Sequence, residues 1–296
     1  VPAQAREKDD LPLGMTFHKD TGGDLINKLN FDVVRDGYTL KFERALPNGL
    51  AVTKSFQFKP DNYGIELAVG IENRGAVKVN VGEDEKPSYT LWWGPGVERL
   101  LSDRYHETIL TGINEGKLIQ KRESGVKSGE RFMALSWLGL KNRYFFVALV
   151  PAESPARGRA LPMGPSEVAV EIEAKSFWLD PGGRREDAYV IYAGPQDMEL
   201  LKAVGHDLDR AVYWGWLDWF SKILLKILKL FYKIIPNYGV GIILLTILMR
   251  AATYPLTRKS MQSAKKMQEL GPEMQKLREK YKDNPQELNK RMMQLY

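Results

Sequence analysis

Arg250 is the single charged residue of a mostly apolar run, Tyr238-Gly-Val-Gly-Ile-Ile-Leu-Leu-Thr-Ile-Leu-Met-Arg-Ala-Ala-Thr-Tyr-Pro-Leu256. A helix of this length is about 28 Å long, close to the bilayer core of about 30 Å. The stretch therefore predicts a membrane-spanning helix, with bounds at residues 237–258. An arginine near the centre of such a helix costs at least about 2.5–3.5 kcal/mol, which makes Arg250 a candidate functional residue.

A polar stripe accompanies Arg250 on the predicted helix. Thr246, Arg250, Thr253 and Thr257 follow one another at spacings of 4, 3 and 4, which puts them on one face. Towards the start of the helix this face becomes apolar at Ile243. The pattern favours a wet recess that opens to one side of the membrane. The alternative is a single-span anchor whose arginine snorkels to the interface about 9 Å away.

Charge divides the chain into two parts. Residues 221–296 hold 15 basic and five acidic residues, so they carry +10, and residues 1–220 carry −4 of the formal net charge of +6. This difference indicates two environments. Four basic residues flank the span on each side, and the positive-inside rule therefore leaves its orientation open. The acidic first part favours a cytoplasmic location for the basic end of the chain.

The first part of the chain has the pattern of a β-sandwich. Alternating apolar and polar residues over 65–72, a turn at 73–75 and a second alternation over 77–81 predict a β-hairpin. Asp36-Gly37 and Pro47-Asn48-Gly49 mark further turns. Many short strands with such turns between them are typical of a sandwich. We assign residues 1–15 to an N-terminal linker and residues 16–212 to a β-sandwich domain with a terminal helix.

Residues 213–236, between the sandwich and the span, predict an amphipathic helix in the membrane interface. Spanning the bilayer would bury four lysines at a cost of roughly 10 kcal/mol, whereas an interfacial helix keeps them in water. Pro236-Asn237 then ends this helix and turns the chain into the span. The alternative is an ordinary core helix of the sandwich domain. The expected interface anchors are Trp214, Trp216, Trp219, Lys222, Lys226, Lys229 and Lys233.

Residues 259–296 predict an antiparallel helical hairpin. Apolar residues recur at the 3 and 4 spacing of a coiled-coil seam, which Gly271-Pro272 interrupts. Asn284-Pro-Gln-Glu287 is a helix start, and the short connection before it requires antiparallel packing. The seam either packs on itself or forms an adaptable methionine-rich surface for hydrophobic clients. Its residues are Met267, Leu270, Met274, Leu277, Tyr281, Leu288, Met292 and Leu295.

The sequence contains no recognisable catalytic or metal-ligating pattern. It has no cysteine, and His18, His106 and His206 lie far apart, so we expect no disulfide, metal site or cofactor. A single-span sensor or scaffold is an alternative function, and it would tolerate the loss of charge at Arg250. A carbohydrate-acting enzyme is another, and it would need paired carboxylates or a histidine in a cleft. The chain lacks an initiator methionine and ends inside a helical pattern, so we expect it to be part of a longer protein.

Several segments of the chain carry a resemblance to a known family: Tyr192-Ala-Gly-Pro-Gln-Asp197, Leu200-Leu201, Gly215-Trp216, Asn237 to Arg250, Tyr254-Pro-Leu-Thr257, Ser263-Ala-Lys-Lys-Met267, Pro272 and Met293-Gln-Leu-Tyr296. These segments resemble the YidC/Oxa/Alb family of membrane-protein insertases. The similarity is dense from Tyr192 to Tyr296, and over residues 16–190 it is architectural only. The segments near the end of the first domain are similar to bacterial members with a large periplasmic domain.

The resemblance implies a fold class and an orientation. The fold would be that of a multi-domain α and β membrane protein. A periplasmic β-supersandwich would be followed by an interfacial amphipathic helix, one transmembrane helix and a cytoplasmic antiparallel helical hairpin. Residues 1–236 would be periplasmic and residues 259–296 cytoplasmic, in a bacterial inner membrane. Family members have five core spans that enclose a hydrophilic groove with one arginine. Arg250 takes the position of that arginine, and this sequence contains one of the spans.

The resemblance also implies a function without bond-breaking chemistry, that of an insertase and chaperone. The groove, with Arg250, Thr246, Thr253 and Thr257, would bind nascent membrane proteins and release their hydrophobic segments into the lipid bilayer. The implied partners are nascent membrane proteins, the lipid bilayer, the Sec translocon and the ribosome. DNA is not among them, and we expect the protein to function as a monomer.

Overall fold

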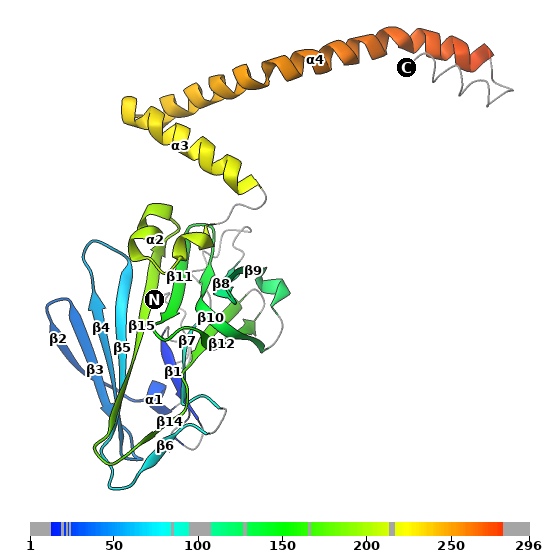
Figure 1. Cartoon of the computed structure of the whole chain (residues 1–296). Coiled ribbons are helices and arrows are strands. Elements are labelled where there is room, and N and C mark those ends of the chain that lie inside the picture. The colour runs from blue at the N-terminus through cyan, green and yellow to red at the C-terminus, as the bar shows by residue number, and fades with distance from the viewer. Residues whose placement is uncertain are drawn as a thin grey trace. The chain divides into compact units, whose positions relative to one another are not determined.

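The computed structural model describes residues 13–18, 21, 23, 25–83, 86–94, 108–126, 129–164, 167–212 and 217–280. The chain divides into two compact units, Val1–Tyr213 and Trp214–Tyr296. The first unit is built mainly of antiparallel strands, and the described part of the second is built of two long helices (Figure 1).

Most strands of the first unit are short and antiparallel. Two short α-helices, α1 (Leu25–Lys28) and α2 (Met198–Val204), and two 3₁₀ helices, η3 (Glu123–Gly125) and η4 (Leu208–Ala211), accompany them. The strands are β1 (Gly14–Phe17), β2 (Asp32–Asp36), β3 (Thr39–Ala45), β4 (Leu50–Phe58), β5 (Gly64–Asn73), β6 (Val79–Val81), β7 (Tyr89–Trp93), β8 (Ile109–Asn114), β9 (Lys117–Arg122), β10 (Glu130–Lys141), β11 (Phe145–Pro151), β12 (Ala156–Gly164), β13 (Glu167–Glu173), β14 (Phe177–Leu179) and β15 (Arg184–Pro195).

Thirteen of these strands form one antiparallel sheet with the order β1-β7-β13-β12-β10-β11-β15-β5-β4-β3-β2, and β8 and β9 extend it from β10. β2 to β5 lie on one side of the domain, and β1, β7 and β12 lie across from them (Figure 1). Val52, Leu67, Leu91, Leu138 and Val170 belong to one buried cluster, although they come from β4, β5, β7, β10 and β13. The sheet therefore closes over a shared core, which confirms the predicted β-sandwich.

A second buried cluster lies under the two helices that end the domain. Trp137, Phe146 and Tyr192 pack there with Leu201 of α2 and Leu208 of η4. The start of α2 is capped because the Asp197 carboxylate accepts hydrogen bonds from the backbone N–H groups of Glu199 and Leu200, at 2.8 and 3.1 Å. This cluster makes α2 and η4 part of the β-domain, so the domain ends only after residue 211.

The turns at Asp36-Gly37 and Pro47-Asn48-Gly49 connect paired strands, as predicted. The hairpin predicted for residues 65–81 is wrong. β5 has the expected alternation, but its two edges are taken by β4 and β15. β6 pairs with β14 instead. The Asn73 amide donates to the carbonyls of both Val77 and Leu179, which holds the turn against the strand that β6 joins.

The second unit contains α3 (Asp218–Ile234) and α4 (Tyr238–Lys280). Pro236-Asn237 separates the two helices, as predicted, and the Asn237 side chain caps α4 by accepting from the N–H groups of Gly239 and Val240. α4 continues through Pro255 and Pro272, so the predicted domain boundary at residue 258 lies inside one helix. Within the described residues, Tyr238–Pro272 is the one helical segment with the length and hydropathy of a membrane span.

Candidate functional site

The predicted polar stripe is exposed along α4. Thr246, Arg250, Thr253 and Thr257 are all exposed in this chain, and Ile243, on the apolar continuation of the face, is exposed as well. Within the described part of the chain, no carboxylate forms an ion pair with the Arg250 guanidinium. The stripe therefore presents one cation to whatever surrounds α4.

The three threonines satisfy their hydroxyl groups within the helix. The hydroxyls of Thr246, Thr253 and Thr257 donate to the carbonyls of Ile242, Met249 and Thr253, at 2.8, 2.8 and 3.0 Å. Such bonds to the preceding turn allow a threonine to lie in an apolar environment at little cost. The threonines alone therefore do not require a wet recess, and the argument for one depends on Arg250.

Packing between α3 and α4 leaves the stripe free. Gly241 is buried at the contact, where an added Cβ would lie 3.2 Å from a Leu228 methyl carbon. The Tyr232 and Tyr238 rings stack at the corner, with centroids 4.1 Å apart. Arg250 follows Gly241 by nine residues, or two and a half turns at about 3.6 residues per turn. It therefore lies on the opposite side of α4 from α3.

The lysines of α3 lie away from its contact with α4. Lys226 precedes Leu228 by two residues, which places it about 200° around the helix. Lys226 and Lys233 are exposed, and the Trp219 side chain is 64% exposed. Lys222 and Lys229 lie on the same face as Lys226, and Trp214 and Trp216 lie outside the described residues.

The predicted seam is only partly described. Met267, Leu270, Met274 and Leu277 lie on α4, and the Met267 side chain is 52% exposed. The remaining seam residues, Tyr281, Leu288, Met292 and Leu295, lie outside the described residues. The antiparallel packing of the hairpin therefore stays a prediction.

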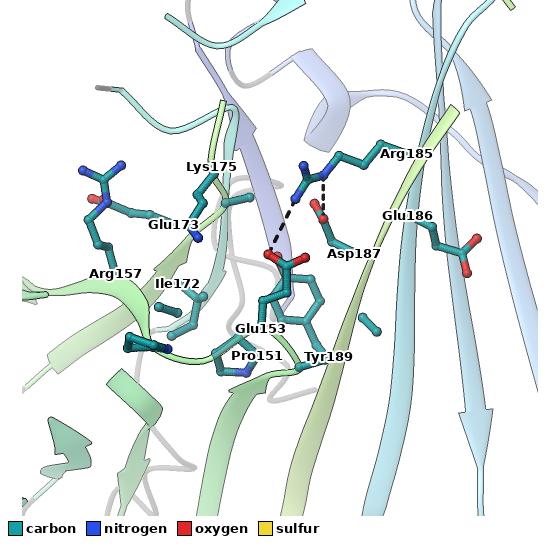
Figure 2. Close-up of a pocket in the computed structure, with 15 residues that line it drawn as sticks. Pro151, Glu153, Arg157, Ile172, Glu173, Lys175, Arg185, Glu186, Asp187 and Tyr189 are labelled. Atoms are coloured by element: carbon teal, nitrogen blue, oxygen red, sulfur yellow. Dashed lines mark hydrogen bonds and ion pairs between the residues drawn. The ribbon is translucent and has the colours of Figure 1, made fainter. Parts of the chain in front are cut away.

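The β-domain carries a polar cavity of about 260 Å³ between β11, β12, β13 and β15. Figure 2 shows the Glu153 and Asp187 carboxylates turned towards the Arg185 guanidinium, at 3.9 and 2.9 Å. Glu173 lies 3.9 Å from Arg157. Among the described lining residues, each of these carboxylates is paired with an arginine. The Glu153 and Asp187 carboxylates share one guanidinium, so they lie near each other with Arg185 between them.

A buried hydrogen-bond network includes Asp187, which lines this cavity. The Tyr89 hydroxyl donates to Asp187 at 2.7 Å and lies 2.9 Å from the Tyr189 hydroxyl. Burial, with the nearby Tyr189 and Asp187, raises the pKa of Tyr89 well above its ordinary value. Burial also raises the pKa of Tyr189. Both phenols are therefore protonated at physiological pH, and the Tyr89 hydroxyl holds the Asp187 carboxylate in place.

An antiparallel β-sandwich followed by an amphipathic helix and an arginine-bearing span defines a membrane protein with a large extramembrane domain. A family model described as the YidC periplasmic domain matches residues 5–227, and one described as a 60Kd inner membrane protein matches residues 230–296. The chain belongs to the YidC family of bacterial inner membrane proteins.

Relatives named membrane protein insertase YidC are similar to most of this chain. Those from Geobacter metallireducens and Geobacter sulfurreducens are 35% and 34% identical, and each match covers 87% of this chain and 47% and 48% of the relative. One from Oleidesulfovibrio alaskensis is 37% identical over 84% of this chain and 46% of the relative. The chain thus spans about half the length of these curated relatives.

Solved structures resemble the β-domain only distantly. A galactose mutarotase-like protein from Lactobacillus casei has a TM-score of 0.38 and 10% identity, over 55% of this chain and 72% of that one. An alpha-galactosidase from Geobacillus stearothermophilus has a TM-score of 0.40 and 13% identity, over 62% of this chain and 27% of that one. At these values the likeness carries no argument about function.

Proposed function

We propose that this chain is the periplasmic domain and first core span of a membrane-protein insertase and chaperone. The complete protein binds nascent membrane proteins in a hydrophilic groove within the membrane and releases their hydrophobic segments into lipid. The relatives named as insertases support this function. It involves binding and partitioning, with no bond made or broken.

The main observation in favour of such a groove is the position of Arg250. It lies on the side of α4 opposite to α3, in the one described segment that is apolar enough to span a membrane. A guanidinium facing lipid costs several kcal/mol, whereas one facing water or a polar partner does not. We infer that further spans of the complete protein pack around this side of α4 and enclose a wet groove.

In this groove Arg250 attracts negative charge on a client. Coulomb attraction at 4 Å rises from about 1 kcal/mol in water to about 4 kcal/mol where the effective dielectric constant is about 20. An acidic or polar tail is therefore stabilised when it enters the groove. The groove also shortens the path of the tail across the bilayer. The part of α4 that precedes Thr246 is apolar. The client's hydrophobic segment, which follows the tail, enters the lipid along this surface.

The remaining parts have roles that fit this proposal. α3 lies in the periplasmic interface, with its lysines in water and Trp219 at headgroup depth. Residues 259–296 form the cytoplasmic hairpin, whose methionine-rich seam packs on itself or contacts clients and the ribosome. The β-domain contacts partner membrane proteins such as the Sec translocon. We propose that the protein works as a monomer, since the groove forms within one chain.

Charge substitutions at Arg250 test the mechanism. We expect Arg250→Lys to keep most activity, and Arg250→Ala to reduce insertion of a client with an acidic tail by roughly tenfold, about 1.4 kcal/mol. Arg250→Glu should reduce it further through repulsion. The measurement is protease protection of the client tail in vesicles that contain the full-length variants at equal amounts.

Arg258→Ala is the matched control, because it removes an arginine from the same helix just after the apolar run 238–256. It should leave insertion unchanged. If Arg250→Glu inserts acidic tails as efficiently as the parent protein does, Arg250 does not work through its charge. That result would favour a single-span sensor or scaffold, which tolerates the loss of this charge.

A further inference from the structure

A second cavity of the β-domain, of about 270 Å³, lies between α1, the start of β1 and the strands β3 and β4. The Trp92 indole forms one wall of the cavity, and it fits there because Gly14 has no side chain. An added Cβ at Gly14 would lie 2.3 Å from the Trp92 indole nitrogen. The lining is aromatic and aliphatic apart from Asn27 and Lys54. Its aromatic side chains are Phe31, Phe42, Phe56 and Trp92.

Lys54 is the polar residue of this cavity whose hydrogen-bond donors are not all used by the described protein groups. Its side chain is only 9% exposed, and its ammonium group donates to the Leu13 carbonyl at 2.9 Å. An ammonium has three donors, and the structure assigns one of them a protein partner. Of the described residues, none supplies a carboxylate to Lys54. Asn27, by contrast, uses its amide nitrogen and oxygen on the backbone of Met15.

Keeping Lys54 here has a cost to the fold. It lies on β4 between Val52, which belongs to the main core, and the half-buried Phe56, which packs against that core. Burial lowers the pKa of Lys54 to about 8, because a charged ammonium loses its hydration there. A leucine or methionine at this position would fill the space without that cost. A buried group with a shifted pKa in a cavity is a candidate for binding.

The aromatic wall is arranged to accept a further apolar group. The Phe31 and Phe42 rings meet at 83° with centroids 6.4 Å apart, and Phe42 and Phe56 meet at 90° and 5.7 Å. The Lys54 ammonium lies 5.9 Å from the Phe31 centroid. The cavity is slightly smaller than typical ligand pockets of roughly 300–1,000 Å³, so its ligand is small. The ligand must also be anionic, because the one available charge is positive.

We propose that this cavity binds a small carboxylate carried on an apolar body, with the carboxylate on the Lys54 ammonium and the body against Phe31, Phe42 and Phe56. The contact to Lys54 is a charge-assisted hydrogen bond, which low solvent exposure strengthens. An aromatic body gains edge-to-face contacts with the phenyl rings. The carboxylate belongs either to a free small acid or to an acidic residue beside an aromatic one in an extended peptide.

Calorimetric titration of the full chain in detergent micelles tests the site. The probes are 4-phenylbutyrate, the uncharged 4-phenylbutanol and a capped peptide with Phe next to Asp. We expect 4-phenylbutyrate to bind the parent chain at least tenfold more tightly than it binds Lys54→Met, and more tightly than 4-phenylbutanol binds the parent. Lys202→Met removes an exposed lysine of α2 and is the matched control, with unchanged binding.

Phe31→Ala keeps Lys54 and removes one ring, so it should weaken the binding of 4-phenylbutyrate while the charge preference remains. Partitioning of a probe into micelles is common to all variants and cancels in their comparison. Tighter binding of the peptide than of 4-phenylbutyrate identifies a polypeptide ligand, and the reverse order identifies a free acid. Equal binding by the parent and Lys54→Met, or no binding of either acidic probe by the parent, overturns the proposal.

Discussion

Two cations of this protein sit in apolar surroundings and are accommodated differently. Arg250 is exposed on an apolar helix, and its charge must be met by groups outside the described chain. Lys54 is buried inside the β-domain and keeps a single hydrogen bond. An arginine stays charged in nearly any environment, whereas a buried lysine shifts its pKa readily. Arg250 is therefore suited to a permanent charge within a membrane, and Lys54 to a ligand that restores its lost interactions.

The shifted pKa of Lys54 predicts how stability depends on pH. It lies near 8 in the folded domain, below its usual 10.5, so between these values the unfolded chain binds more protons. The free energy of unfolding should therefore rise from about pH 8 to about pH 10.5. Below pH 8 it should be lowered by the full cost of burying the charged Lys54 ammonium. Relative to Lys54→Met, the rise should be up to about 3 kcal/mol.

Thermal unfolding of the parent chain and Lys54→Met, followed by tryptophan fluorescence across this pH range, measures the difference. Burial also lowers the pKa of Lys141 to about 8, but Lys141 is present in both proteins and cancels. At pH 7 the Lys54→Met variant should be the more stable of the two. A difference that does not change with pH would mean that Lys54 keeps its ordinary pKa in the folded state.

Sequence reasoning singled out Arg250 as a candidate residue and did not single out Lys54, for a physical reason. Arg250 interrupts a 19-residue apolar run, which is a local signal. Lys54 lies in a mixed strand, where its neighbours Thr53 and Ser55 make a polar residue look ordinary. The alternation of Val52, Lys54 and Phe56 does indicate that Lys54 points inward. The cavity itself could not be predicted, because it is closed by α1 and by Trp92 on a strand distant in sequence.

Local patterns predicted the elements better than their partners. The alternation over residues 65–72 correctly predicted a strand, but the strand after the turn, β6, pairs with β14 rather than with β5. Strand pairing is decided by long-range contacts that a local pattern does not contain. We predicted the end of the span at residue 258 because the apolar run stops just before it. α4 continues past this residue, since a helix can pass from lipid into water without ending.

The amphipathic pattern of α3 predicts its depth in a membrane. Cysteines for spin labels can be introduced singly, because the chain has none of its own. A label at Lys226→Cys should be accessible to a water-soluble relaxation agent, and one at Ile227→Cys, about 100° around the helix, should be accessible to oxygen in lipid. The measurement uses the full-length protein in bilayers. Deep burial of both labels would show that α3 crosses the membrane.

The whole molecule separates into parts with different physical demands. The β-domain has its own closed core and a second buried cluster that includes α2 and η4. α3 and α4 expose apolar side chains that need lipid or further helices. Among the described residues, the candidate groove side chains all belong to α4. The insertase activity that we propose should therefore depend on the membrane part and little on the β-domain.

Deleting the β-domain tests this independence, and the structure decides where to cut. A cut near residue 190 would leave Tyr192, Leu201 and Leu208 without the Trp137 and Phe146 side chains that cover them. Deleting residues 14–212 removes both clusters together and keeps α3. We expect the full-length protein with this deletion to support growth of a depletion strain, and the same deletion with Arg250→Glu to fail. Loss of growth with the deletion alone, at normal protein levels in the membrane, would show that the β-domain takes part in insertion itself.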